Sequence, residues 1–270
     1  MVKVASIQYE YVQNASKQER LEKAGKLIDQ CAEAELILLP EMWNFGWHEM
    51  ADSTRGSVKK LERIAEAIDG ETVSYLMEKA KQTGAYIVTG TILEKRGDRF
   101  YNTLAMLNPK GEIIATFSKM HLSNYLGYLE GTLLTPGEDV VVVDTELGKI
   151  GFSVCYDLRF PELFRKMALE RGAEIILMIS AFAAGRTANW LTLSNARATE
   201  NQCYFISCDA VGTDNDSAYL GYSQIIDYKG NVLASAEDKE CIIRGELDMK
   251  GLREFREQMP HLKNHWIKLS

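Results

Sequence analysis

The stretch that decides the fold is Lys149-Ile-Gly-Phe-Ser-Val-Cys155, followed at once by Tyr156-Asp-Leu-Arg-Phe-Pro-Glu-Leu163. Its first half is an apolar run of strand length, and Pro161 suits the first turn of a helix that we expect to reach Arg171. Cys155 therefore stands at a strand-to-helix corner. Since helix N-termini and neighbouring cations can lower the pKa of a thiol, we expect Cys155 to be a nucleophilic thiolate. The alternative is a buried cysteine that acts as a small hydrophobic side chain.

Two further chemically capable side chains follow apolar runs directly. Glu35-Leu-Ile-Leu-Leu-Pro40 leads into Glu41, and Ile113-Ile-Ala-Thr-Phe-Ser118 leads into Lys119. Loops at the carboxyl ends of strands converge on the site in α/β proteins, so these two side chains could meet Cys155. Taken singly, each could equally be a solvated charge at the end of a strand.

The three segments contain blocks that resemble the signatures of the nitrilase superfamily, also called carbon-nitrogen hydrolases. The blocks are Leu38-Leu-Pro-Glu41, Ser118-Lys-Met-His-Leu122 and Val154-Cys-Tyr-Asp-Leu-Arg-Phe-Pro-Glu-Leu163, and Arg197-Ala-Thr-Glu-Asn201 and Gly221-Tyr-Ser-Gln-Ile-Ile226 are also similar. The resemblance covers nearly the whole chain and implies an α/β fold, a four-layer α-β-β-α sandwich that forms a single domain over residues 1–270. It also implies homodimers or larger homo-oligomers, assembled through the helices after the cysteine and the C-terminal tail.

The same resemblance implies a Glu-Lys-Cys triad. Glu41 would be general base and acid, Lys119 would stabilise the oxyanion, and Cys155 would attack. The backbone N–H of Tyr156 is the expected second oxyanion donor. Glu130 stands where family members carry a second glutamate, and we expect a fourth catalytic residue there; the alternative is an exposed loop carboxylate.

Five residues near these blocks are candidates for contact with substrate. Trp43 and Phe45 could line the pocket or fill the core. Tyr125 lies in the loop that departs most from the family pattern, and such loops set specificity. Arg159 could bind a substrate carboxylate or brace the turn after Cys155, and Phe182 is a further candidate for the pocket wall.

Composition narrows the class of protein. The chain has 270 residues, 46% of them hydrophobic, a net charge of −7, and no apolar run long enough to span a bilayer. Acids and bases are interspersed, which argues against nucleic acid as a partner. The five cysteines lack a framework spacing, as expected in the reducing cytoplasm. The four histidines form no ligand cluster and there is no Cys-x-x-Cys pair, so we expect no metal and no cofactor.

Within the superfamily, the block around Cys155 is most similar to the omega-amidase and Nit-protein branch, whose members hydrolyse the terminal amides of 2-oxo acids. The expected reaction is attack on a small carboxamide, formation of a thioester with release of ammonia, and hydrolysis. The alternatives are an N-carbamoyl amine or amino acid amidohydrolase, and an aliphatic amidase or nitrilase. A non-catalytic scaffold that retains the fold is an alternative of another class.

Hydrophobic periodicity predicts the remaining elements. We expect strands over residues 2–8, 86–93, 101–107, 112–117, 174–180, 204–210, 222–227 and 242–247, and helices over about 16–34, 58–68, 72–83 and 190–201. Hairpin turns are expected at 108–111 and 229–231.

Overall fold

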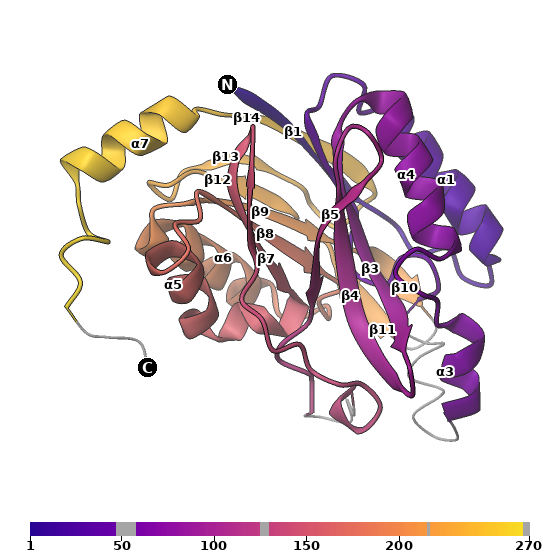
Figure 1. Cartoon of the computed structure of the whole chain (residues 1–270). Coiled ribbons are helices and arrows are strands. Elements are labelled where there is room, and N and C mark those ends of the chain that lie inside the picture. The colour runs from indigo at the N-terminus through magenta and orange to yellow at the C-terminus, as the bar shows by residue number, and fades with distance from the viewer. Residues whose placement is uncertain (47–57, 125–129, 215–216, 267–270) are drawn as a thin grey trace.

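Two six-stranded sheets lie face to face in the computed structural model (Figure 1). The structure describes residues 1–46, 58–124, 130–214 and 217–266. The first sheet has the spatial order β14-β1-β2-β3-β4-β5. Its strands are β14 (Cys241–Leu247), β1 (Val2–Gln8), β2 (Leu36–Leu38), β3 (Tyr86–Arg96), β4 (Arg99–Leu107) and β5 (Ile113–Ser118).

The second sheet has the spatial order β13-β12-β9-β8-β7-β6. Its strands are β13 (Val232–Ser235), β12 (Gln224–Ile226), β9 (Tyr204–Asp209), β8 (Ile175–Ser180), β7 (Gly148–Val154) and β6 (Val142–Thr145). In each sheet the three central strands are parallel, β1 to β3 in the first and β7 to β9 in the second, and antiparallel strands extend both edges.

Helices cover the outer face of each sheet. The first sheet carries α1 (Lys17–Asp29) and α4 (Glu71–Thr83), and the second carries α5 (Pro161–Leu169) and α6 (Thr187–Asn201). Figure 1 shows the resulting order of layers: α1 and α4, first sheet, second sheet, α5 and α6. The predicted four-layer sandwich is confirmed.

The side chains of β1 show why the sheet is covered on both faces. Val4 lies in the core between the sheets, and the hydroxyl of Ser6 donates to the carbonyl of Ser207 at 3.0 Å. Ala5 and Ile7 point the other way and pack with side chains of α1 and α4. Successive side chains of a strand alternate between faces, so a strand apolar at every position needs a partner layer on each side.

The boundaries of two predicted helices were wrong. α1 ends at Asp29 rather than near 34, because the N–H of Cys31 bonds to the carbonyl of Ile28 in a tightened last turn. The helix predicted over 58–68 ends earlier, at Ile64 (α3, Val58–Ile64), whereas the helix predicted from Pro161 does begin there, after a 3-10 turn over Cys155–Arg159.

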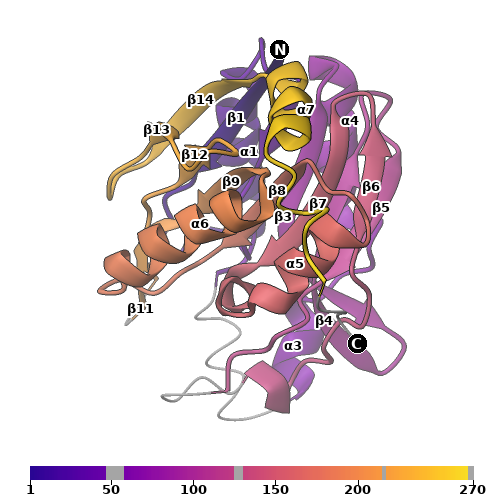
Figure 2. The same cartoon turned by 90° about the vertical axis from the view of Figure 1, so that its left-hand side faces the viewer.

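Several elements were missed by the periodicity. They are β6, the two-stranded sheet of β10 (Val211–Asp214) and β11 (Ser217–Leu220), and α7 (Met249–Gln258). The side chain of Asp248 accepts a hydrogen bond from the N–H of Gly251 and caps α7. Figure 2 looks onto the outer face of the second sheet, with α5 and α6 in front and α7 beyond their ends.

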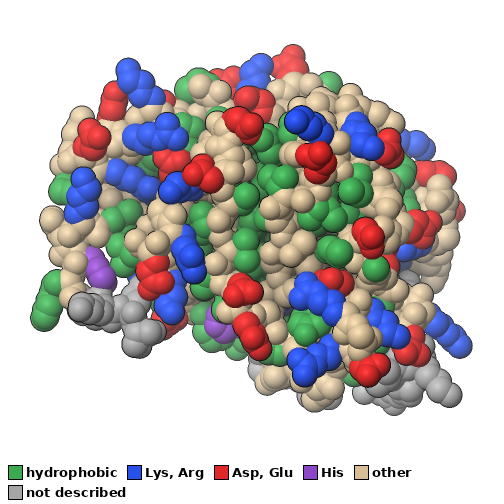
Figure 3. Space-filling view, in the orientation of Figure 1, with side chains coloured by type: hydrophobic (Ala, Val, Ile, Leu, Met, Phe, Trp, Pro, Cys, Tyr) green, Lys and Arg blue, Asp and Glu red, His purple; other side chains and the backbone are tan. Residues whose placement is uncertain are grey.

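The surface carries both signs of charge. On the face shown in Figure 3, Lys and Arg side chains lie among Asp and Glu side chains. Within the ranges that the structure describes, no helix is both long enough and apolar enough to cross a membrane.

Gly90 makes the close approach of β3 to the Glu41 segment possible. It has a φ of +69°, and a Cβ built there would lie 2.2 Å from the carbonyl oxygen of Pro40 and 2.6 Å from the indole of Trp43. We expect Gly90→Ala to lower the free energy of unfolding by about 3 kcal/mol, because left-handed strain and overpacking add. Urea unfolding measures the loss.

Gly97→Ala is the matched control. Gly97 also has a positive φ, +59°, but nothing lies within 4 Å of an added Cβ. It should lose about 1 kcal/mol from backbone strain alone. Equal losses in the two variants would contradict a role for the contact with Pro40.

Candidate active site

The ends of three strands bring the predicted catalytic residues together. Glu41 follows β2, Lys119 follows β5 and Cys155 follows β7, and all three line one cavity. The backbone N–H of Glu41 donates to the carbonyl of Ser180 at 3.3 Å, which joins the first sheet to the end of β8 in the second. The site therefore lies where both sheets end.

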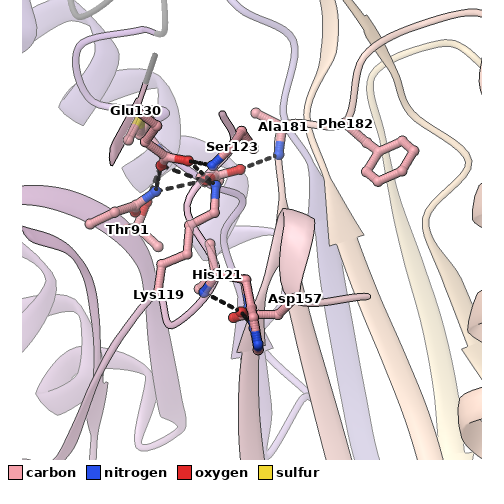
Figure 4. A network of polar contacts seen from close by, with 12 residues as sticks. Thr91, Lys119, His121, Ser123, Glu130, Asp157, Ala181 and Phe182 are labelled. Atoms are coloured by element: carbon pink, nitrogen blue, oxygen red, sulfur yellow. Dashed lines mark hydrogen bonds and ion pairs between the residues drawn. The ribbon is translucent and has the colours of Figure 1, made fainter. Parts of the chain in front are cut away.

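Lys119 is held between two carboxylates in the interior. Its ammonium nitrogen lies 3.1 Å from Oε1 of Glu41, and 3.0 and 2.9 Å from the two carboxylate oxygens of Glu130. All three side chains are fully or almost fully buried. Figure 4 shows the side chain of Lys119 reaching up toward the carboxylate of Glu130. Because a buried charge needs compensation by opposite charge and hydrogen bonds, the three groups form one unit.

Three hydrogen-bond donors that sequence reasoning missed fix the carboxylates. The side-chain nitrogen of Asn102 donates to Oε1 of both Glu41 and Glu130, at 2.7 and 3.2 Å. The backbone N–H of Ala181 donates to Glu41 at 2.9 Å, and that of Ser123 donates to Glu130 at 2.8 Å. The one available signal was the polar pair Asn102-Thr103 among the apolar core positions of β4.

The two carboxylates determine the charge state of Lys119. Burial alone would lower the pKa of Lys119, but Glu130 and Glu41 together outweigh it and hold that pKa well above its ordinary value. Burial raises the pKa of Glu130, and the attraction of Lys119 offsets part of this rise. The lysine is therefore a permanent cation, suited to stabilising an oxyanion.

Cys155 occupies a strained backbone position. Its φ is +47°, in the left-handed region that side chains other than glycine rarely adopt. The carboxylate of Asp157 accepts the N–H of Val154 at 2.9 Å, and Arg197 of α6 donates to the carbonyl of Leu158 at 3.2 and 2.9 Å. These contacts hold the turn and present the thiol to the cavity.

Asp157 also ties this turn to the segment that carries Lys119. Its Oδ1 accepts the backbone N–H of His121 at 2.9 Å and lies 2.7 Å from Nδ1 of the same residue (Figure 4). The imidazole stacks on the ring of Phe160, with centroids 3.7 Å apart. One buried carboxylate thus sets the position of the lysine segment relative to the cysteine.

The thiol of Cys155 does not have the lowered pKa that we expected. Burial, and then the charge of Glu41, raise its pKa well above the ordinary value, and the attraction of Lys119 offsets only part of this. The expectation failed because the thiol precedes a 3-10 turn rather than an α-helix and is surrounded by two carboxylates. A thiol with a raised pKa is mostly uncharged at neutral pH and needs a base if it is to act as a nucleophile.

The candidates for substrate contact fall in different places. Tyr156 and Phe182 line the cavity. The described lining includes neither Trp43, whose fully buried indole N–H donates to the carbonyl of Thr89 at 2.8 Å, nor Phe45, which packs in a small apolar cluster. Both fill the core instead of the pocket wall.

Two further candidates require a separate account. Arg159 is also absent from the described lining of the cavity, and its guanidinium lies over the ring of Phe182, 5.5 Å from the centroid. Tyr125 lies outside the described residues. The cavity instead receives Arg186 and Tyr219, which the sequence did not single out.

Similarity to known proteins identifies the family of this chain. A model of the carbon-nitrogen hydrolase family matches residues 3–257. The chain belongs to the carbon-nitrogen hydrolase family. The family predicted from the signature blocks is thereby confirmed.

Relatives of this carbon-nitrogen hydrolase include named amidases. Omega-amidase NIT2-B of Xenopus laevis is 33% identical over 254 residues, 90% of this chain and 88% of that protein. The 2-oxoglutaramate amidase of Bacillus subtilis (strain 168) is 31% identical over 243 residues, 90% and 89% of the two chains. The crystal structure of Saccharomyces cerevisiae Nit3, a member of branch 10 of the nitrilase superfamily, has a TM-score of 0.84 at 30% identity and covers 96% and 94%. The similarity to the omega-amidase and Nit branch is confirmed.

The raised pKa of Cys155 predicts the pH at which the ultraviolet absorbance of its thiolate appears. At neutral pH the difference in ultraviolet absorbance between the wild type and Cys155→Ala should show no thiolate, and the thiolate signal should emerge only in alkaline solution. In Glu41→Gln the signal should emerge at lower pH, because a negative charge that raises the pKa is removed while Lys119 remains. A thiolate signal in the wild type at neutral pH would contradict the prediction.

Proposed function

We propose that the protein is an amidase that hydrolyses the terminal carboxamide of a small 2-oxo acid, with 2-oxoglutaramate as the leading substrate. The observation that carries the proposal is the placement of Cys155, Lys119 and Glu41 on one cavity, with Lys119 held between Glu41 and Glu130. The named omega-amidase and 2-oxoglutaramate amidase relatives support the choice of substrate.

In the first half-reaction, Glu41 takes the proton of the Cys155 thiol while the sulfur attacks the carboxamide carbon. The ammonium of Lys119 and the backbone N–H of Tyr156 stabilise the tetrahedral oxyanion, a contribution of roughly 3 to 4 kcal/mol per donor. Glu41 then returns the proton to the amide nitrogen. The C–N bond breaks, ammonia leaves, and a thioester remains on Cys155.

In the second half-reaction, Glu41 takes a proton from water, and the oxygen attacks the thioester carbon. The same donors stabilise the second oxyanion. The C–S bond then breaks, Glu41 returns its proton to sulfur, and the product leaves as a carboxylic acid, which loses its remaining proton to solvent and becomes a carboxylate. Glu130 keeps Lys119 charged and in place through both steps, so no further catalyst is needed.

Ammonia release from 2-oxoglutaramate tests this function. We expect turnover by the wild type, and a fall of roughly 10³-fold or more in Cys155→Ala, which lacks the nucleophile. Glu130→Gln, which retains the hydrogen-bond acceptor for Ser123 but removes one charge from Lys119, should lose part of the activity. Release that persists in Cys155→Ala would rule out the thioester route.

If the protein does not hydrolyse 2-oxoglutaramate, its action on other substrates decides between the alternatives. Turnover of N-carbamoyl compounds, simple aliphatic amides or nitriles in its place would overturn the omega-amidase assignment and keep the hydrolase. No turnover of any of them would favour the scaffold that retains the fold.

We further propose that the enzyme works in the cytoplasm as a homodimer or larger homo-oligomer. Five cysteines without a disulfide support a reducing compartment. The family resemblance supports an interface on the helices after the cysteine turn and on the C-terminal tail. Met259 and Trp266 in that tail are 44% and 88% exposed, as expected of side chains that a second chain covers.

The oligomeric state can be measured by light scattering on the eluting protein. We expect a mass of two or more chains, and truncation after Gln258 should shift the population toward single chains because it removes these apolar side chains. A single-chain mass for the intact protein at all concentrations would contradict the proposal.

A further inference from the structure

One wall of the cavity is built by pairing between β11 and the residues that follow β8. The N–H of Leu220 donates to the carbonyl of Phe182 at 2.8 Å, and the N–H of Ala184 donates to the carbonyl of Ala218 at 2.9 Å. Ala183 and Tyr219 form a bridge between these two pairs. The segment between β8 and α6 is therefore fixed by backbone hydrogen bonds on the cavity side.

Arg186 enters the cavity from the end of this wall. Gly185, with a φ of +79°, turns the chain, and Arg186 then stands at the N-cap of α6, where its carbonyl accepts the N–H of Trp190 at 3.0 Å. Its side chain is half-buried and lines the same cavity as Cys155. The backbone is thus fixed, and Arg186 reaches the cavity from the start of a helix.

Two cations are among the described residues that line the cavity, and they lie on different elements of the fold. Among the described residues that line it, the charged ones are Glu41, Lys119 and Arg186. The ammonium of Lys119 lies within hydrogen-bonding distance of two buried carboxylates. Arg186 stands at the start of α6, on a different element from Lys119. Arg159, the cation singled out in the sequence, lies over Phe182 and not on the described lining.

We propose that Arg186 binds the carboxylate of the substrate and selects anionic amides over neutral ones. This inference rests on the proposed function and adds its specificity-determining residue. The planar guanidinium offers two parallel N–H donors to a carboxylate. A neutral amide of similar size does not make this paired, charge-assisted contact.

Binding of 2-oxoglutarate, the dicarboxylate that the proposed reaction releases, tests the inference without turnover. Calorimetric titration would use proteins that carry Cys155→Ala alone or together with Arg186→Gln, Arg186→Lys, Arg159→Gln or Arg171→Gln. We expect Arg186→Gln to weaken binding by roughly 10- to 100-fold, with Arg186→Lys between it and the parent. The exposed Arg171 lies outside the cavity, so Arg171→Gln, which removes the same charge, should bind as the parent does.

Unchanged binding in Arg186→Gln, loss of binding in Arg159→Gln alone, or no binding by the parent would each overturn the inference. Kinetic measurements on proteins that retain Cys155 then distinguish this inference from the proposed function. Arg186→Gln should raise KM for 2-oxoglutaramate with little change in kcat, and leave a neutral aliphatic amide unaffected. If the parent binds 2-oxoglutarate through Arg186 while the wild type does not hydrolyse 2-oxoglutaramate, the substrate assignment fails and the role of Arg186 stands.

Discussion

The ammonium of Lys119, buried between the carboxylates of Glu41 and Glu130, is the interaction on which the site depends. Removing such a charge from water costs several kcal/mol, and only well-placed opposite charges and hydrogen bonds offset this. The bonds from Asn102 to both carboxylates, and from the Ala181 N–H to Glu41, supply them. An ammonium fixed in this way needs no reorganisation when an oxyanion forms beside it, which is the physical basis of its catalytic value.

Two carboxylates around one ammonium also determine the state of the nucleophile. The cluster already carries an excess of negative charge, so a thiolate at Cys155 would add to it in a site from which water is largely excluded. Burial and these charges therefore raise the pKa of the thiol. In the proposed mechanism, transfer of its proton to Glu41 moves the negative charge from carboxylate to sulfur without increasing it.

The contact between the two sheets is what assembles this site. Glu41 and Lys119 follow strands of the first sheet and Cys155 follows a strand of the second, so no single sheet carries all three side chains. Asp157 links the cysteine turn to the lysine segment, and the bond from the Glu41 N–H to Ser180 joins the sheets at the same end. Packing between the sheets thus holds the site together, because a shift of one sheet would separate Glu41 from the thiol, and the proposed chemistry depends on that distance.

The sequence by itself determined the layers, the family and the candidate catalytic residues. Runs apolar on both faces, as in β2, required a sheet covered on both sides, and the blocks around Glu41, Lys119 and Cys155 named the family. Only the tertiary structure decided which groups hold them. Asn102 and Ala181 lie 61 and 140 residues from Glu41 along the chain, and no local pattern encodes such contacts. The sequence also misjudged the thiol, because the pKa of Cys155 depends on burial and on nearby charges, which exist only once both sheets have packed.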